Sequence, residues 1–535
     1  MKLYGFTNCV LETPLQTGRA YQDPFNDITL DAVITDPTGA ERRVPGFWAG
    51  ENQWRLRYSS ALPGLHHVRT VCSDGSDTDL HGREYQIDLA PYEGSNPLYL
   101  HGGLRISDDR RTLEHADGTP FFWLGDTWWL GLSKRLQWPD EFRQLAADRV
   151  AKGFSVIQIV AGVYPDMPYG DPRGENEAGM PWDIDYRSIN PDYFNMADLR
   201  IAALANSGLL PCVVGAWAYH LKWMGVQKMK DHWRNLVARW GAYPTVWCLA
   251  GEGAMPYYLS ETRDDDIRMQ REGWTEIGRY VREIDPFARP VTIHPTNIGR
   301  DQVTDDSVLD LNMLQTGHGD QDSIPNTIRS IVSSYDREPT MPVFNSEVCY
   351  EGIIGASGAR IQRFMFYTCM LSGACGHTYG ANGIWQFNRA GDPYGASPSG
   401  WAWGGDPWDI CMRYPGSAQL GLGKRLFERY DWWRMRPCPD RIEPRWAEDN
   451  YRASYAAGVP GQVLICYLPH GWPATVHGLD ANASLRAYLF NPVDGEQIDI
   501  AEITPSADGD WETPKPPVRG DWVLVVEEAA GEAAT

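Results

Sequence analysis

Paired cysteines and long apolar runs are both missing from this chain. Ten cysteines are scattered over 535 residues, and no two have the CxxC spacing. A zinc ribbon or a disulfide framework is therefore disfavoured. No run of 18 uninterrupted apolar residues occurs, and the opening MKLYGFTNCVLETPLQ lacks the apolar stretch of a signal peptide. We therefore expect a cytoplasmic protein with no membrane partner.

Positive charge is scarce. The chain has 48 Lys and Arg against 70 Asp and Glu, a formal net charge of −22. Nucleic acids and anionic membranes bind basic surfaces, so neither is an expected partner. The negative charge favours solubility and does not select a substrate. The composition leaves homo-oligomerisation open.

Aromatic residues, in contrast, are abundant, with 23 Trp and 26 Tyr. Large cores would use such residues, but flat aromatic faces also pack well against the C–H groups of sugars. The composition therefore favours a carbohydrate ligand to a small degree.

The sequence pattern divides the chain into three regions. Residues 1–97 alternate short strand-like runs such as DITLDAVITDPTG with turn residues, which is typical of a β-sandwich. Residues 98–438 alternate strands with helices. Residues 439–535 return to short strands such as QVLICYLP and predict a second small β-sandwich, with a frayed tail at 529–535.

The middle region predicts a (β/α)8 TIM barrel. Helical patterns, such as 140–153 and 264–285, lie between most of its strand-like runs. An open doubly wound sheet is the competing fold, but no glycine-rich phosphate loop follows the first strand. The eight strand-like runs are 121–126, 155–163, 209–217, 245–252, 290–295, 309–317, 341–347 and 376–381.

Two glutamates end strands of this predicted barrel. Glu252 ends the fourth strand and Glu347 the seventh. Catalytic groups of barrel enzymes lie at the C-terminal ends of the strands, so both side chains are expected on one face. Two facing carboxylates can hydrolyse a glycosidic bond, one as acid/base and the other as nucleophile. The structural alternative for each glutamate is a salt bridge or a helix cap.

Four segments together resemble a known family. TPFFWLGDTWWLGLSKR, AKGFSVIQIV, PTVWCLAGE and MPVFNSEVCYEG are similar to the apiosidase-like glycoside hydrolases, family 140 and its relatives, over about 115–435. The resemblance implies a catalytic barrel between two β-domains, with Glu252 as the acid/base and Glu347 as the nucleophile. The family typically has Gly-Gly-Asp where this chain has Ala250-Gly251-Glu252, so the resemblance does not imply apiose as the sugar.

Residues near the first strands are candidates for binding the sugar. Asp126 is expected at the end of the first strand, where it could accept hydrogen bonds from hydroxyls or cap the next segment. Trp128 and Trp129 are candidate subsite walls, with one of the two expected in the core. Trp217 is a candidate apolar wall beside the glutamates.

Histidines and a tyrosine follow the later strands. His294 and His318 are expected to bind sugar hydroxyls or the two carboxylates, together with His377 at the start of strand eight. A metal site is the alternative, but the spacing of known metal sites is missing, so no metal or cofactor is predicted. Tyr379 either contacts the nucleophile or is an ordinary half-buried tyrosine.

Two long loops are candidates for setting the length and identity of the substrate. The loop at 395–409 carries Trp401 and Trp403 among glycines and prolines, a composition suited to a sugar-stacking cover. The insertion at 165–185 follows strand two. Because such loops can close one end of a cleft, we expect exo action.

The sequence thus predicts a retaining, exo-acting glycoside hydrolase. Its expected substrate is a plant or microbial glycan side chain or an oligosaccharide. The alternatives are a non-catalytic carbohydrate-binding protein and a related glycosidase that acts mainly by transglycosylation.

Overall fold

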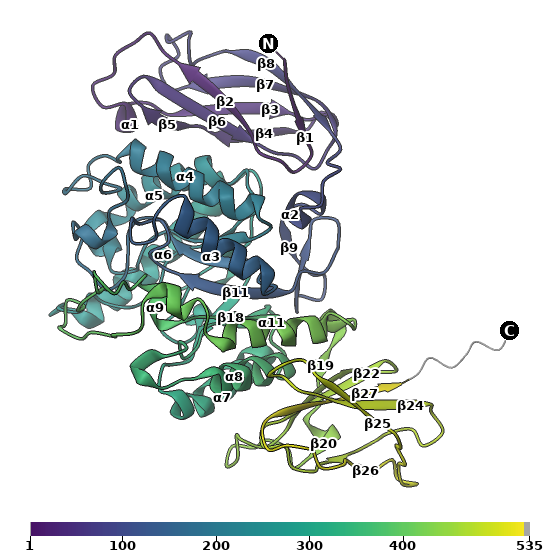
Figure 1. The fold of residues 1–535 in the computed structure, drawn as a ribbon. Coiled ribbons are helices and arrows are strands. Elements are labelled where there is room, and N and C mark those ends of the chain that lie inside the picture. The colour runs from purple at the N-terminus through teal and green to yellow at the C-terminus, as the bar shows by residue number, and fades with distance from the viewer. Residues whose placement is uncertain (1, 529–535) are drawn as a thin grey trace.

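The chain folds into a central barrel with a β-rich part at either end (Figure 1). The computed structural model describes residues 2–528, so the predicted tail at 529–535 lies outside the described residues. The predicted fold class, a TIM barrel flanked by two small β-domains, is confirmed.

The N-terminal part contains two sheets whose inner faces bury apolar side chains such as Leu30 and Leu56. All pairs in both sheets are antiparallel except β1 with β8, which is parallel. The five-stranded sheet has the order β1 (Lys2–Phe6), β8 (Glu84–Ala90), β7 (Gly64–Cys72), β3 (Leu30–Thr35), β4 (Glu41–Pro45), and the three-stranded sheet has the order β2 (Leu11–Gln16), β6 (Gln53–Tyr58), β5 (Phe47–Gly50).

The barrel is formed by eight parallel strands, as the sequence predicted. Between the last two neighbours, β15 and β16, the Asp310 amide donates to Val291 O at 2.7 Å, so the barrel is nearly closed there. The strands are β11 (Trp123–Trp128), β12 (Val156–Val160), β13 (Leu210–Val214), β14 (Val246–Cys248), β15 (Val291–Thr292), β16 (Asn312–Gln315), β17 (Val343–Glu347) and β18 (Gly376–Tyr379).

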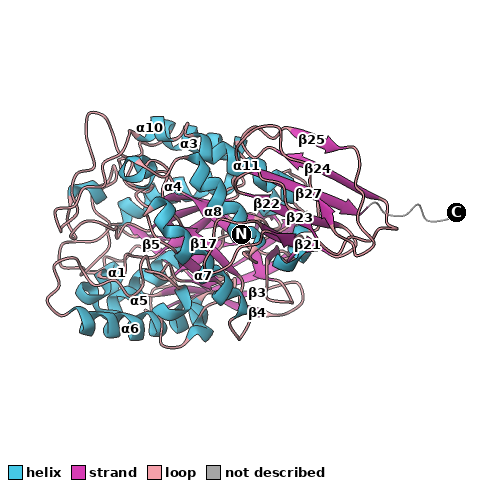
Figure 2. Cartoon of the chain, turned by 90° about the horizontal axis from the view of Figure 1, so that it is seen from below, coloured by secondary structure: helices cyan, strands magenta, loops and turns pink. Residues whose placement is uncertain are grey.

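Helices surround the barrel strands (Figure 2). Short 3-10 turns stand where a helix between β15 and β16 would be expected. The longer helices are α3 (Asp140–Ala151), α4 (Pro191–Asn206), α5 (His220–Trp240), α6 (Arg263–Ile284), α7 (Ile324–Asp336), α8 (Ala359–Leu371) and α11 (Pro415–Phe427).

Helix α3 shows both the strength and the limit of the apolar pattern. Phe142 and Leu145 are buried as expected, and Gly153 has φ 86°, the left-handed conformation that ends helices. Val150, which the pattern placed on the same face, is 43% exposed. Its neighbour Arg149 is fully buried instead, because a buried carboxylate pairs with it.

The C-terminal part again has two sheets, and it is fastened to α8. Arg363 donates to both oxygens of Asp521 at 2.7 and 2.6 Å. Its larger sheet has the order β19 (Arg436–Pro437), β21 (Tyr455–Val459), β22 (Val463–Leu468), β27 (Trp522–Glu528), β24 (Leu485–Phe490), β25 (Gln497–Ile500), and the smaller one β20 (Ile442–Glu443), β23 (Thr475–Val476), β26 (Trp511–Glu512).

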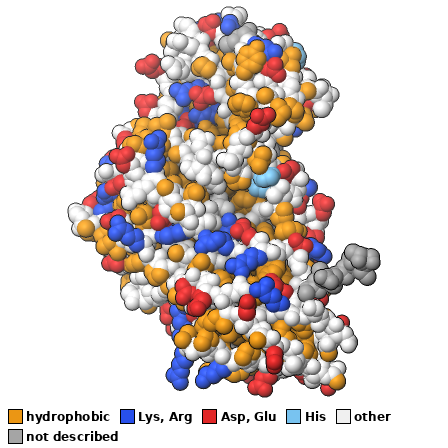
Figure 3. Space-filling view, turned by 45° about the vertical axis from the view of Figure 1, so that its right-hand side comes forward, with side chains coloured by type: hydrophobic (Ala, Val, Ile, Leu, Met, Phe, Trp, Pro, Cys, Tyr) orange, Lys and Arg blue, Asp and Glu red, His pale blue; other side chains and the backbone are white. Residues whose placement is uncertain are grey.

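On the face shown in Figure 3, side chains of both charge signs are spread among hydrophobic and uncharged ones. Every helix within residues 2–528 falls short of the length and apolar character needed to span a bilayer. All ten cysteines lie in that range, and each is free.

Candidate active site

Glu347 lies at the mouth of the barrel as the last residue of β17, and it is 5% exposed. His318 Nε2 lies 2.9 Å from its Oε1 and donates to it in the tautomer with the proton on Nε2. His294 Nε2 lies 3.2 Å from its Oε2, without the alignment of a hydrogen bond. Two imidazoles thus border one carboxylate at the end of the seventh strand.

Glu252 faces the same space from the neighbourhood of the fourth strand. The sequence predicted that the fourth strand would end at Glu252. Strand β14 ends at Cys248 instead, so Glu252 lies four residues beyond it. A Cβ at Gly251 would lie 2.1 Å from the Trp217 ring, so glycine lets the chain pass close to this ring. Glu252 then takes φ 48°, and Trp217 Nε1 donates to its Oε2 at 3.2 Å.

Gln315, at the end of β16, joins the two carboxylates. Its Nε2 donates at 3.1 Å to Oε1 of Glu252 and at 3.1 Å to Oε1 of Glu347. The two Oε1 atoms can therefore be no further apart than twice that distance. The structure thus brings the two predicted glutamates into one pocket.

The surroundings push the pKa values of the two glutamates apart. Burial raises the pKa of Glu252 to about 7, and the nearby charge of Glu347 adds to this effect. Burial would raise the pKa of Glu347 as well, but the close His294 imidazole, the hydrogen bond from His318 and the charges of both rings outweigh it and hold that pKa well below its usual range. At neutral pH one carboxyl group can hold a proton while the other is ionised.

The pKa of His318 is raised, which favours a charged imidazolium beside the Glu347 carboxylate. Burial alone would lower it, but the hydrogen bond and charge of Glu347 outweigh burial and raise the pKa. The ring also stacks on Tyr350, with centroids 4.9 Å apart. His318 is thus held in place by contacts on its edge and on its face.

Aromatic side chains wall the pocket around these polar groups. Trp129 donates to the Tyr350 hydroxyl at 2.9 Å, which fixes two of the walls against each other. Such a lining combines apolar ring faces with hydrogen-bonding groups, which suits the C–H faces and hydroxyls of a sugar. The lining residues are Trp129, Pro165, Asp166, Trp217, Glu252, Tyr258, Gln315, His318, Glu347, Tyr350, Ile353, Trp385 and Trp403.

Asp126 and Trp128 do not lie where the sequence predicted. Strand β11 runs on to Trp128, so Asp126 is inside the strand and fully buried. Arg149 Nε donates to its Oδ2 at 2.6 Å, and Trp128 Nε1 donates to the same oxygen at 2.7 Å. Trp128 is itself fully buried against Phe142. Both are core residues, and only Trp129 of the tryptophan pair lines the pocket.

Tyr379 and two histidines also take places behind the pocket wall. The Tyr379 hydroxyl donates to Glu351 Oε2 at 2.6 Å and not to Glu347. His377 is fully buried with its ring edge-on to Phe366, on the helix side of β18. His294 is fully buried and reaches the pocket only through Glu347. These side chains therefore cannot touch a sugar in this conformation.

The two tryptophans of the long loop after β18 differ in position. Trp403 lines the pocket, and its Nε1 donates to Asp166 Oδ2 at 3.1 Å. Trp401 is 57% exposed and lies edge-on to Trp403, with ring centroids 6.0 Å apart. The loop thus contributes one wall and one solvent-facing ring beside it.

Several pocket residues were missed by the sequence analysis. Gln315 is the last residue of β16 and lies two residues before the end of the predicted run 309–317, so the strand-end argument that found the glutamates could have found it. Tyr350 follows Glu347 by three residues. Asp166 and Tyr258 lie in long loops, where no periodic pattern shows which side chain turns inward.

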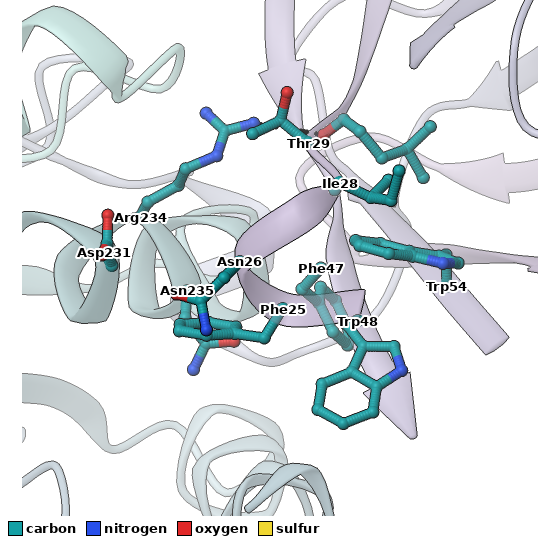
Figure 4. A pocket seen from close by; sticks show the side chains of 12 residues that line it. Phe25, Asn26, Ile28, Thr29, Phe47, Trp48, Trp54, Asp231, Arg234 and Asn235 are labelled. Atoms are coloured by element: carbon teal, nitrogen blue, oxygen red, sulfur yellow. Dashed lines mark hydrogen bonds between the residues drawn. The ribbon is translucent and has the colours of Figure 1, made fainter. Parts of the chain in front are cut away.

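A second cavity lies between the N-terminal part and α5 and shares no lining residue with the glutamate pocket (Figure 4). Asp231 and Arg234 of α5 line this cavity together with side chains of the N-terminal part, including Trp48 and Trp54. It holds a single acidic residue and so lacks a pair of carboxylates. No group of three or more potential metal ligands comes together among residues 2–528.

An eight-stranded barrel with two facing carboxylates in an aromatic pocket is an arrangement that glycoside hydrolases use. Residues 107–434 match the apiosidase-like catalytic domain, and residues 7–73 match a domain of unknown function, DUF5060. The chain therefore belongs to the apiosidase-like family, as its motifs indicated.

Comparison with solved structures shows the same fold. A protein named only as a glycoside hydrolase is 24% identical with a TM-score of 0.67, over 82% of this chain and 99% of its own. A family 5 glycoside hydrolase from Bacteroides vulgatus is 22% identical with a TM-score of 0.66, over 82% and 96%. A second protein from Bacteroides vulgatus is 16% identical with a TM-score of 0.71, over 98% and 100%. No curated protein matches the chain.

Proposed function

We propose that this protein is a retaining glycoside hydrolase in which Glu252 is the acid/base and Glu347 the nucleophile. The observation that carries the proposal is that Gln315 Nε2 donates to both carboxylates while His318 bonds to Glu347 alone, an arrangement that fits the opposite shifts of the two pKa values. A general acid must hold its proton near neutral pH, and a nucleophile must stay ionised.

The proposed reaction has two steps. Glu347 attacks the anomeric carbon while protonated Glu252 gives its proton to the leaving oxygen, which forms a glycosyl ester and frees the aglycone. Glu252, now ionised, takes a proton from water, whose oxygen attacks the same carbon and releases Glu347. Two inversions return the sugar with its original configuration.

The spacing of the carboxylates supports retention over inversion. Their Oε1 atoms lie within twice 3.1 Å, because Gln315 Nε2 reaches both. Inverting enzymes keep the two carboxyl groups about 6.5–9.5 Å apart to admit a water, whereas retaining enzymes use about 5–5.5 Å.

We further propose exo action on a glycan side chain or an oligosaccharide. The walls from Trp385 and Trp403, on or beside the long loop after β18, support this by enclosing the pocket next to the carboxylates. The family match leaves the sugar open, because Glu252 stands where apiosidase-like members typically have a shorter acid.

A panel of aryl glycosides that varies the sugar and the anomer tests this proposal. We expect turnover of at least one member, and NMR of the first product formed should show the anomer of the substrate. Initial release of the opposite anomer would refute retention. Sugar binding without turnover of any member would instead favour a carbohydrate-binding protein.

A further inference from the structure

A third carboxylate, Asp166, lines the pocket beside the two glutamates. It comes from the loop after β12, is 5% exposed, and has φ 58°. A left-handed conformation is unfavourable for a residue with a side chain and persists only where the surroundings hold it. The surroundings of the loop therefore hold this carboxyl group in a fixed position at the pocket.

Two neutral donors hold the Asp166 carboxylate. The Tyr258 hydroxyl donates to Oδ1, and Trp403 Nε1 donates to Oδ2 at 3.1 Å. These partners come from the loops after β14 and β18, so Asp166 is the point where three loops meet. Its bond to Trp403 also fastens the loop at 395–409.

No lysine or arginine within residues 2–528 forms an ion pair with Asp166. Arg173, whose charge acts on Asp166, is bound by Asp171 at 2.7 Å and donates to the carbonyls of Tyr394 and Ala396. It reaches only the backbone oxygen of Asp166, at 3.4 Å. Burial accordingly raises the pKa of Asp166, although the bonds from Tyr258 and Trp403 oppose this effect.

The Asp166 carboxylate has acceptor capacity left over. A carboxylate offers about four lone-pair sites on its two oxygens, and Tyr258 and Trp403 fill one on each. A buried charge without an ion pair is costly, and further donors would offset that cost. Sugar hydroxyls are such donors, and the pocket wall is where they would arrive.

We propose that Asp166 is a substrate-binding residue, which accepts hydrogen bonds from hydroxyls of the bound sugar and, through Trp403, holds the loop at 395–409 beside it. This inference rests on the proposed function, because it requires a sugar in the pocket. It makes Asp166 a determinant of which hydroxyl pattern is accepted.

Kinetics of matched variants separate sugar binding from loop anchoring. On the aryl glycoside that the panel identifies, Asp166→Asn should raise KM and lower kcat/KM by about 10- to 100-fold, the cost of losing a hydrogen bond to a charged group. The loss should be equal for good and poor leaving groups, unlike the loss of an acid/base. Trp403→Phe removes the indole N–H that bonds Asp166 but keeps an aromatic ring and the carboxylate, so it should cost less than about tenfold.

Asp185→Asn is the control, because Asp185 is an exposed carboxylate in the same insertion. It should match the wild type. A Trp403→Phe variant as impaired as Asp166→Asn would reduce Asp166 to an anchor of the loop and overturn the proposal.

Monodeoxy analogues of that glycoside provide a test that a partial folding defect in the variant does not affect, because each protein's activity on an analogue is compared with its own activity on the full sugar. For the wild type, removing one particular hydroxyl should cost about 10-fold or more in kcat/KM, and in Asp166→Asn the same removal should cost little. Equal losses in both proteins, or no sensitive hydroxyl in the wild type, would overturn the inference while the hydrolase proposal stands. A wild-type protein inactive on the whole panel would instead refute the proposed function and this inference with it.

Discussion

At the residue scale, the site depends on how the polar neighbours of the two glutamates are distributed between them. Gln315 donates to both glutamates, while His294 and His318 lie against Glu347 alone. With these donors around it the pKa of Glu347 is lowered, whereas burial raises the pKa of Glu252. The acid/base assignment therefore follows from neighbours and not from the glutamates themselves.

The pH dependence of kcat/KM should show this assignment. In the proposed mechanism Glu252 acts in its protonated form, so activity should fall as pH rises through about 7. Glu347 acts in its ionised form, and its low pKa keeps it ionised throughout the mildly acidic range. In Glu252→Ala the alkaline limb should vanish on an activated aryl glycoside. An alkaline limb that persists in this variant would assign the titration to another group.

Gln315→Met should move the alkaline limb upward. The hydrogen bond from Gln315 lowers the pKa of Glu252, so its loss raises that pKa further. A bond to a charged group contributes roughly 1.5–3 kcal/mol, which sets an upper limit of about one to two pH units. Gln321→Met, an exposed site, is the control. A downward shift of the limb would contradict the shared-donor geometry.

At the element scale, the ends of the barrel strands decide which residues reach the pocket. The eight strands could be predicted because each is a short apolar run between helices. The residues at which they end were harder to predict. Barrel strands are buried on both faces, so they lack the alternation of apolar and polar residues whose loss would show where a strand stops. In FFWLGDTWW the strand continues past Asp126 to Trp128. Asp126 was therefore wrongly placed in the pocket.

The candidate site was predictable to the same extent. Glu347 and Glu252 could be found because each follows an apolar run. Asp166 and Tyr258 could not, because contacts between loops distant in sequence turn them inward. His294 was placed at the correct strand end, but the local pattern does not show that it faces Glu347 from behind the wall.

Asp126→Asn should therefore reduce stability and leave sugar binding intact. The change removes the charge that Arg149 pairs with, at a site where both side chains are fully buried. Breaking a buried pair costs about 3–5 kcal/mol, which urea unfolding would measure. KM should stay unchanged under conditions where the variant is folded.

Asp108→Asn is a matched control for this change, because the Asp108 side chain is 97% exposed. It should unfold like the wild type. A raised KM with full stability in Asp126→Asn would restore the role in sugar binding that the sequence suggested.

At the scale of the whole molecule, buried charges join the barrel to the N-terminal part. Asp198 of α4 accepts from Arg57 of β6 at 2.8 Å and from Arg239 of α5 at 2.8 Å. Trp240 Nε1 donates to its other oxygen at 2.8 Å. All of these side chains are buried, so this contact is part of the folded core.

Asp198 should make the stability of the protein depend on acidic pH. Burial alone would raise its pKa, but the charges of Arg57 and Arg239 outweigh burial and lower it. The stabilisation is thus fully present above the unfolded-state value of about 3.9 and is lost as pH falls below it. Urea unfolding of Asp198→Asn should show a lower free energy at pH 7 and a smaller further loss in acid. If the free energy of unfolding of this variant fell in acid as much as that of the wild type, Asp198 would not be the group that causes the loss of stability.

The central claim is that Glu347 forms a covalent bond to the sugar. Glu252→Ala, mixed with a dinitrophenyl glycoside of the sugar that the panel identifies, needs no acid to form the glycosyl ester but lacks the base to hydrolyse it. We predict a burst of dinitrophenol equal to the protein concentration. Mass spectrometry of the digested protein should then place one glycosyl group on the peptide that contains Glu347. A burst with no modified peptide, or a glycosyl group on any other residue, would contradict the account.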